Sequence, residues 1–128
     1  MPSPVKTVLV ADDDTTVRAF IAAALERQGF AVLLAPDADA AIEFANDDGI
    51  PIDVLVTDVT MPGRSGIELA REVRAMRPSM GVVLMSGWRL DHPVDGIPGR
   101  AVELLEKPFD LSALARAVER ALEQRIVR

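Results

Sequence analysis

The chain has 128 residues and a formal net charge of −6 at pH 7. Its length suits a single domain over residues 1–128, and its content of 49% hydrophobic and 27% charged residues is typical of a chain that folds around a core. The absence of cysteine excludes disulfides, thiolate nucleophiles and zinc–thiolate sites, and the acidic balance argues against direct binding to nucleic acid.

The N-terminus shows no targeting signal. Residues 1–4 lack the basic and long apolar regions of a signal peptide, and the longest apolar run, residues 19–25, is too short to span a bilayer. We therefore expect a cytoplasmic protein without membrane insertion.

Short apolar runs alternate along the chain with segments of helical periodicity. Residues 5–11 are almost continuously apolar after Lys6, which is typical of a strand covered on both faces in a parallel sheet. After the acidic turn 12–14, apolar positions recur at helical spacing until Gly29, which ends this helix. The next expected elements are a strand at 31–35, a helix at 37–45, a strand at 54–57, a helix at 66–76 and a strand at 82–85.

The fourth connection interrupts this alternation. Residues 90–100 contain two prolines and two glycines, which cost a helix interior about 3 and about 1 kcal/mol each. We expect a loop or a single short turn there, so that the fourth helix is short or missing. A fifth strand at 101–105 and a closing helix at 111–126 complete the pattern.

The alternation predicts an α/β fold, a doubly wound parallel sheet of five strands with helices on both faces. Ligands of such sheets bind outside the carboxyl ends of the strands, where the strand order reverses. Polar side chains follow the predicted strands at this edge: Asp12, Asp13, Asp58, Ser86 and Lys107. We therefore expect these side chains to lie close together.

The three aspartates of this group need a partner of opposite charge. Two carboxylates about 4 Å apart repel by roughly 4 kcal/mol at an effective dielectric constant near 20. Because the ligands are oxygens and no His or Cys lies nearby, Mg²⁺ is the natural cation. Lys107 and Ser86 would complete a shell around a phosphoryl group, and a carboxylate can attack phosphorus. This edge is therefore predicted to support phosphoryl transfer.

Four segments at predicted strand ends carry a family resemblance: VLVADDD (8–14), VLVTD (54–58) with MPG (61–63) and Gly66, VLMSG (83–87), and KPF (107–109). Together they resemble the receiver domain of two-component response regulators over essentially the whole chain. The resemblance implies a flavodoxin-like fold with strand order 2-1-3-4-5. The ending LLEKPF is similar to receivers of hybrid sensor kinases, and both a stand-alone regulator and part of a larger kinase stay open.

The resemblance assigns a role to each residue of the acidic edge. It implies that Asp58 accepts a phosphoryl group from a histidine kinase or a histidine phosphotransfer protein. Mg²⁺ would be held by Asp13, Asp58 and the backbone carbonyl of Thr60, with Asp12 assisting through water. Lys107 would pair with the phosphoryl oxygens.

Ser86 would swing toward the phosphoryl group and report phosphorylation to the surface. The chain would then be a phosphoacceptor switch that assists its own phosphorylation and dephosphorylation, not an enzyme in the usual sense. Leu104 stands where the family usually carries Tyr or Phe, so the usual coupling of this switch lacks its aromatic side chain. Because the fourth connection is interrupted, we expect the partner that reads the switch to contact residues 88–100.

Three further residues have simpler interpretations. Asp14 is expected to be only the N-cap of the first helix. Trp88 either caps the core or shields the acyl phosphate at the rim of the site. His92 is expected to be an exposed loop residue and not a ligand.

Two other classes of function compete with the receiver. Residues 12–16 also spell the D-x-D-x-T motif of haloacid-dehalogenase-type phosphatases, which would make Asp12 the nucleophile and Asp14 the acid or base. That family needs a further acidic pair after the lysine, where this chain offers only Asp110. A pseudo-receiver that binds partners without phosphorylation is disfavoured, because all five expected site residues are present.

Overall fold

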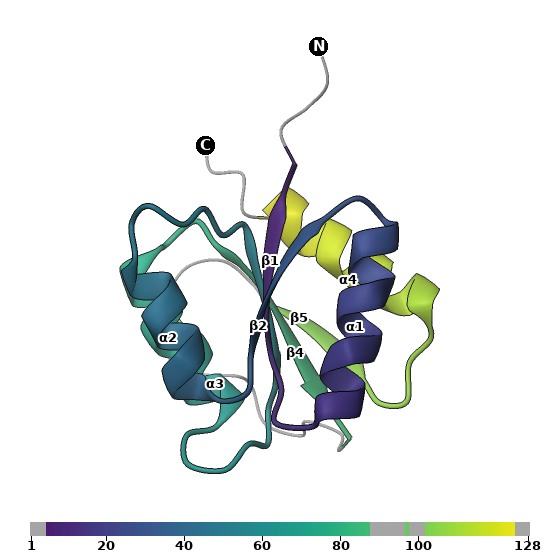
Figure 1. Cartoon of the computed structure of the whole chain (residues 1–128), viewed down its shortest axis with the longest axis horizontal. Coiled ribbons are helices and arrows are strands. Elements are labelled where there is room, and N and C mark those ends of the chain that lie inside the picture. Colours follow the sequence, from purple (N-terminus) through teal and green to yellow (C-terminus); the bar gives the residue numbers. More distant parts are fainter. Residues whose placement is uncertain (1–4, 88–96, 98–101, 125–128) are drawn as a thin grey trace.

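The five strands lie parallel in the order β2-β1-β3-β4-β5, as expected (Figure 1). The structure is a computed structural model that describes residues 5–87, 97 and 102–124. Its strands are β1 (Thr7–Ala11), β2 (Ala31–Ala35), β3 (Val54–Asp58), β4 (Gly81–Ser86) and β5 (Glu103–Glu106). The predicted α/β class and the flavodoxin-like strand order are both confirmed.

Helices cover both faces of this sheet (Figure 1). They are α1 (Thr15–Arg27), α2 (Ala38–Asn46), α3 (Gly66–Met76) and α4 (Leu111–Gln124). Successive residues of β1 point to opposite faces, so that Leu9 packs in the core under α2 and α3 while Val8 and Val10 pack under α1 and α4. All five residues of β1 are buried, which explains the almost continuous apolar run in the sequence.

Several element boundaries differ from the prediction. β1 begins at Thr7 instead of Val5, because its neighbour β2 begins opposite Thr7 and Val5 is 65% exposed. The second helix starts one residue late, because Asp37 is its N-cap and accepts a hydrogen bond from the amide of Ala40. β5 begins at Glu103, where its pairing with β4 starts.

Some expectations concern residues outside those that the structure describes. These are the interrupted fourth connection with Trp88 and His92, the start of the predicted fifth strand at Ala101 and the last residues of the predicted closing helix. Among the described helices, none combines the length and the apolar character that crossing a membrane requires.

The strand order fixes where a site can form. β1 pairs with β2 on one side and with β3 on the other, and the helices that follow β1 and β2 lie on opposite faces of the sheet. The order reverses at this point, which leaves the carboxyl ends of β1 and β3 open to a ligand. Because Ala11 pairs with Thr57, the residues that come next on the two strands lie side by side.

Candidate functional site

Three carboxylates meet at the carboxyl ends of β1 and β3. One oxygen from each of Asp12, Asp13 and Asp58 lies within 4.8 Å of the others. Asp12 is fully buried, Asp58 is half-buried and Asp13 is exposed, so the cluster reaches from the core to the surface. The structure thus brings together the three aspartates that the sequence places after these strands.

Only one of the two oxygens of the Asp12 carboxylate accepts a hydrogen bond from the described residues. Its Oδ1 accepts a hydrogen bond of 2.9 Å from the amide of Asp14, but its Oδ2 is buried with no hydrogen-bond partner among the described residues. Burial raises the pKa of Asp12 above its ordinary value, and the charges of Asp58 and Asp13 add to the rise, against the Asp14 amide and Lys107. Burial and the neighbouring carboxylates therefore outweigh the favourable effect of the Lys107 charge on the ionised form of Asp12.

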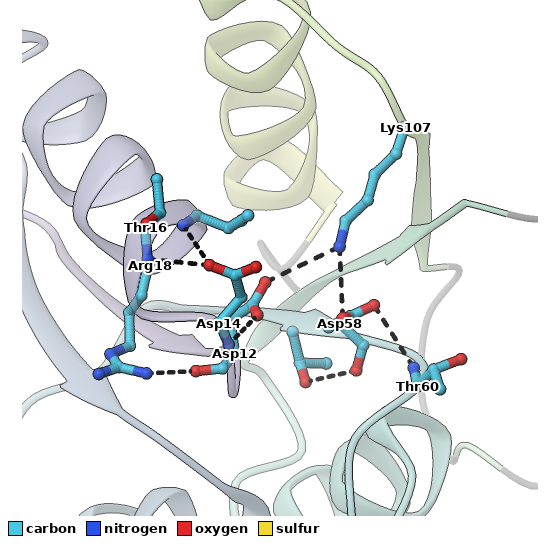
Figure 2. A network of polar contacts seen from close by, with 9 residues as sticks. Asp12, Asp14, Thr16, Arg18, Asp58, Thr60 and Lys107 are labelled. Carbon is cyan, nitrogen blue, oxygen red and sulfur yellow. Dashed lines mark hydrogen bonds and ion pairs between the residues drawn. The ribbon is translucent and has the colours of Figure 1, made fainter.

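Lys107 approaches the cluster from the residue after β5. Figure 2 shows its side chain extended toward Asp12 and Asp58, with Nζ 3.9 Å from Oδ2 of Asp12 and 3.3 Å from Oδ2 of Asp58. The backbone amide of Lys107 donates to the carbonyl of Ser86, which holds the ends of β5 and β4 together. Ser86 is the last residue of β4 and is buried.

Hydrogen bonds hold the segment that follows Asp58 against the sheet. The amide of Val59 donates to the carbonyl of Met85, and the amide of Gly66 donates to the carbonyl of Val59 at 2.8 Å. A Cβ on Gly66 would lie 2.0 Å from the carbonyl oxygen of Asp58, so only glycine fits there. Thr60 lies within this segment, and its amide is 3.4 Å from Oδ1 of Asp58 (Figure 2).

Arg18 is a site neighbour that the sequence analysis did not identify. Its Nη1 donates a hydrogen bond of 2.7 Å to the backbone carbonyl of Asp12 (Figure 2). Long helical side chains lean toward the N-terminus of their helix, so an arginine one turn into α1 reaches the residues before it. The sequence therefore held a signal for this contact, because an arginine six residues after Asp12 would lean back toward it.

One of the simpler interpretations from the sequence is confirmed. The Oδ1 of Asp14 accepts hydrogen bonds from the amides of Thr16 and Val17, which confirms Asp14 as the N-cap of α1. Leu104 on β5, whose exposure the sequence did not predict, is 50% exposed and presents an aliphatic side chain to solvent.

The donor set fits a divalent cation with oxygen ligands. Three carboxylates lie within reach of one point, and the buried Oδ2 of Asp12 is an acceptor that no described donor satisfies. Neither His nor Cys belongs to the cluster, which disfavours zinc and leaves a hard cation such as Mg²⁺. A bound cation would neutralise the repulsion among the carboxylates.

Comparison with known proteins gives one family. The sequence model of the response regulator receiver domain matches residues 8–119. The transcriptional regulatory protein FixJ from Azorhizobium caulinodans is 42% identical over 90% of this chain and 54% of its own length. The sensor kinase CckA from Brucella abortus is 34% identical over 92% of this chain and 13% of its own length.

The structural comparison agrees with the sequence comparison. A response regulator receiver protein from Sinorhizobium medicae superimposes with a TM-score of 0.85 at 32% identity, covering 95% of this chain and 98% of the other. The match to CckA supports the resemblance to receivers of hybrid kinases. This chain spans about half of FixJ and a smaller part of CckA. The chain belongs to the family of response regulator receiver domains.

Proposed function

We propose that Asp58 is the phosphoacceptor of this receiver domain and takes its phosphoryl group from a histidine kinase or a histidine phosphotransfer protein. The observation that carries the proposal is the position of its carboxylate. Asp58 is partly open to solvent, and its Oδ2 lies 3.3 Å from Nζ of Lys107, whereas Asp12 is fully buried. A nucleophile for a protein-bound phosphoryl group needs both this access and a neighbouring positive charge.

The transfer would be a direct displacement at phosphorus. A carboxylate oxygen of Asp58 forms a bond to phosphorus while the bond between phosphorus and the imidazole nitrogen of the donor breaks, and that nitrogen keeps the electron pair. A carboxylate nucleophile needs no general base. The Lys107 ammonium, already next to Asp58, would offset the negative charge that the phosphoryl oxygens bring.

We propose Mg²⁺ as the cation of this site. Asp13, Asp58 and the backbone carbonyl of Thr60 would hold it, with Asp12 assisting through water. When bound, the ion would supply positive charge next to the transferred phosphoryl group. Two observations support this assignment: the cluster of three carboxylates, and the buried Oδ2 of Asp12, which accepts no hydrogen bond from the described residues.

As a member of its family the chain is a phosphoacceptor switch and not an enzyme in the usual sense. We propose that it assists both its own phosphorylation and its own dephosphorylation, with Lys107 and Ser86 as the other residues of the site. Ser86 would turn toward the phosphoryl oxygens and start the conformational change. The aliphatic Leu104 would leave that change to be transmitted by other contacts than an aromatic rotation.

The phosphatase alternative is not favoured. It needs Asp14 as an acid or base, but the Oδ1 of Asp14 caps α1 by accepting from two backbone amides. A phosphatase mechanism would also give no role to Asp58, whose Oδ2 lies next to Nζ of Lys107. The family match to receiver domains agrees with this reading.

The test is incubation of the protein with Mg²⁺ and acetyl phosphate, followed by intact-mass and tandem mass spectrometry. We expect one phosphoryl group per chain, located on Asp58 and absent from Asp58→Asn. Asp48→Asn, in an exposed loop, is the matched control and should be phosphorylated like the wild type. An adduct on Asp12 with multiple turnover would indicate a phosphatase, and an unmodified wild type would indicate a pseudo-receiver.

A further inference from the structure

We propose that Arg64 is a positioning residue of this site, because it clamps the loop between β3 and α3 to the pair of helices α2 and α3. The clamp would set the affinity of the acidic cluster for its divalent cation. This inference rests on the proposed function, since the loop of residues 59–65 contains Thr60, whose carbonyl is a proposed ligand.

One guanidinium connects three parts of the fold. Nη2 of Arg64 lies 2.9 Å from Oδ1 of Asp39 in the first turn of α2, and Nη1 contacts Oε1 of Glu72 on α3. A lysine could make one of these contacts at a time, but the planar fork of arginine makes both. The loop is thereby tied to two helices through a single side chain.

Met61 anchors the first half of the loop, because it is buried in the same apolar cluster as Ala38 and Ala41 of α2, and Arg64 acts on the second half. A hollow of about 180 Å³ lies beside the N-terminus of α2 and is lined by Asp37, Ala38, Asp39, Pro62, Gly63 and Arg64. The two ends of the loop are fixed by other means. Val59 accepts from the amide of Gly66, and Ser65 forms a capping box with Glu68. Arg64 and Asp39 both line this hollow, and their ion pair joins the loop to α2 beside it.

The contacts of Arg64 would affect the affinity for the cation through the position of Thr60. Thr60 lies four residues before Arg64 in the same loop, and a released loop would hold the Thr60 carbonyl less closely in its ligating position. Partners that orient metal ligands change affinity by about 10-fold to 100-fold. Because the Arg64 side chain is 37% exposed, we expect a smaller effect, a loss of affinity for Mg²⁺ of roughly threefold to tenfold in Arg64→Met.

The experiment compares Arg64→Met, Arg64→Lys and a control, Arg116→Met, on an exposed position of α4. Titration calorimetry gives the affinity for Mg²⁺, and hydrogen exchange without metal gives the protection of the Gly66 amide. We expect Arg64→Met to bind Mg²⁺ more weakly and to exchange this amide faster. Arg64→Lys should fall between it and the wild type, and Arg116→Met should match the wild type. Saturating Mg²⁺ should restore the rate of phosphorylation by acetyl phosphate.

A second variant distinguishes the loss of the Arg64 contacts from a general loss of folding. Asp39→Ala combined with Glu72→Ala keeps Arg64 but removes both of its partners, and it should reproduce the effect of Arg64→Met. Wild-type affinity and exchange in Arg64→Met and in this double variant would overturn the inference while leaving the proposed function intact. Failure of the wild type itself to bind Mg²⁺ would overturn both.

Discussion

The charged side chains at the two edges of the sheet differ in how completely they are hydrogen-bonded. At the edge formed by the amino ends of the strands, Arg77 after α3 donates three hydrogen bonds of 2.8 to 3.1 Å, to the carbonyls of Ala45, Asp47 and Ile50. At the carboxyl edge, Asp12 keeps one carboxylate oxygen buried without a hydrogen-bond partner among the described residues, next to two other carboxylates.

This difference separates stability from function. Arg77, whose guanidinium is hydrogen-bonded, joins the end of α3 to the end of α2 and the loop after it, and these bonds stabilise the fold. An unsatisfied acceptor among like charges destabilises it, and native proteins keep such groups mainly at functional sites. This contrast supports our proposal that the carboxyl edge holds a cation and a phosphoryl group, while the hydrogen bonds of Arg77 stabilise the fold at the amino edge.

The largest effect is expected from Gly66→Ala, which tests the packing behind the phosphoacceptor. Its Cβ would lie 2.0 Å from the carbonyl oxygen of Asp58, so the backbone of β3 or α3 must move. We expect a loss of about 3 kcal/mol in the free energy of unfolding, measured in urea, together with slower phosphorylation. Gly87→Ala, where a Cβ meets nothing within 4 Å, is the control. Equal stability of the two variants would contradict this expectation, because it would mean that Gly66 and the carbonyl of Asp58 move apart in solution at little cost.

Arg77→Leu tests the opposite edge. Removing three hydrogen bonds to backbone carbonyls should lower the free energy of unfolding by about 2 to 3 kcal/mol. The affinity for Mg²⁺, measured by calorimetry on the folded variant, should stay at the wild-type value. A large loss of Mg²⁺ affinity in this variant would mean that the two edges are not independent.

Asp12→Asn is expected to stabilise the metal-free protein. Because burial raises the pKa of Asp12 in the folded state, the folded protein holds this proton more tightly than the unfolded chain does. The stability from this group is complete below its ordinary pKa of 3.8 and is lost as the pH rises through the raised folded value. At neutral pH the variant with the neutral Asn should therefore be more stable than the wild type. Urea unfolding between pH 5 and 8 without metal checks the sign, and a less stable variant would contradict it.

The smallest effect is expected from Asp14→Ala, next to the cluster but outside its chemistry. Loss of this N-cap should cost about 1 kcal/mol in the free energy of unfolding, as should the matched Asp37→Ala at α2. Phosphorylation of Asp58 should persist in both variants. Abolished phosphoryl chemistry in Asp14→Ala alone would revive the phosphatase alternative.

Much of this arrangement could be predicted from the sequence because its causes are local. Apolar runs and helical periodicity determine the order of the elements, and parallel strands place their carboxyl ends at one edge, which brings Asp12, Asp58 and Lys107 together. Strand boundaries were less predictable, because β1 begins where its neighbour β2 begins and not where the apolar run does.

The contacts of two long arginine side chains could not be predicted in this way. Arg64 and Arg77 contact atoms on other segments, at sequence separations of 25 and 32 residues, whereas Arg18 contacts Asp12 only six residues away and could have been identified from the lean of helical side chains. The two longer-range contacts depend on how helices pack on the sheet, which no periodicity in the sequence encodes. The roles of Ser86 and Thr60 likewise stay predictions from the family resemblance.

The measurement that tests the central claim most directly is the effect of Mg²⁺ on the free energy of unfolding of the wild type and of Asp12→Asn, with NaCl at equal ionic strength as the reference. If the carboxylates gather to hold a cation, the wild type should gain about 1.4 kcal/mol at ten times its dissociation constant, and at that concentration Asp12→Asn should gain far less. No gain by the wild type beyond that in NaCl, or an equal gain by Asp12→Asn, would contradict the account.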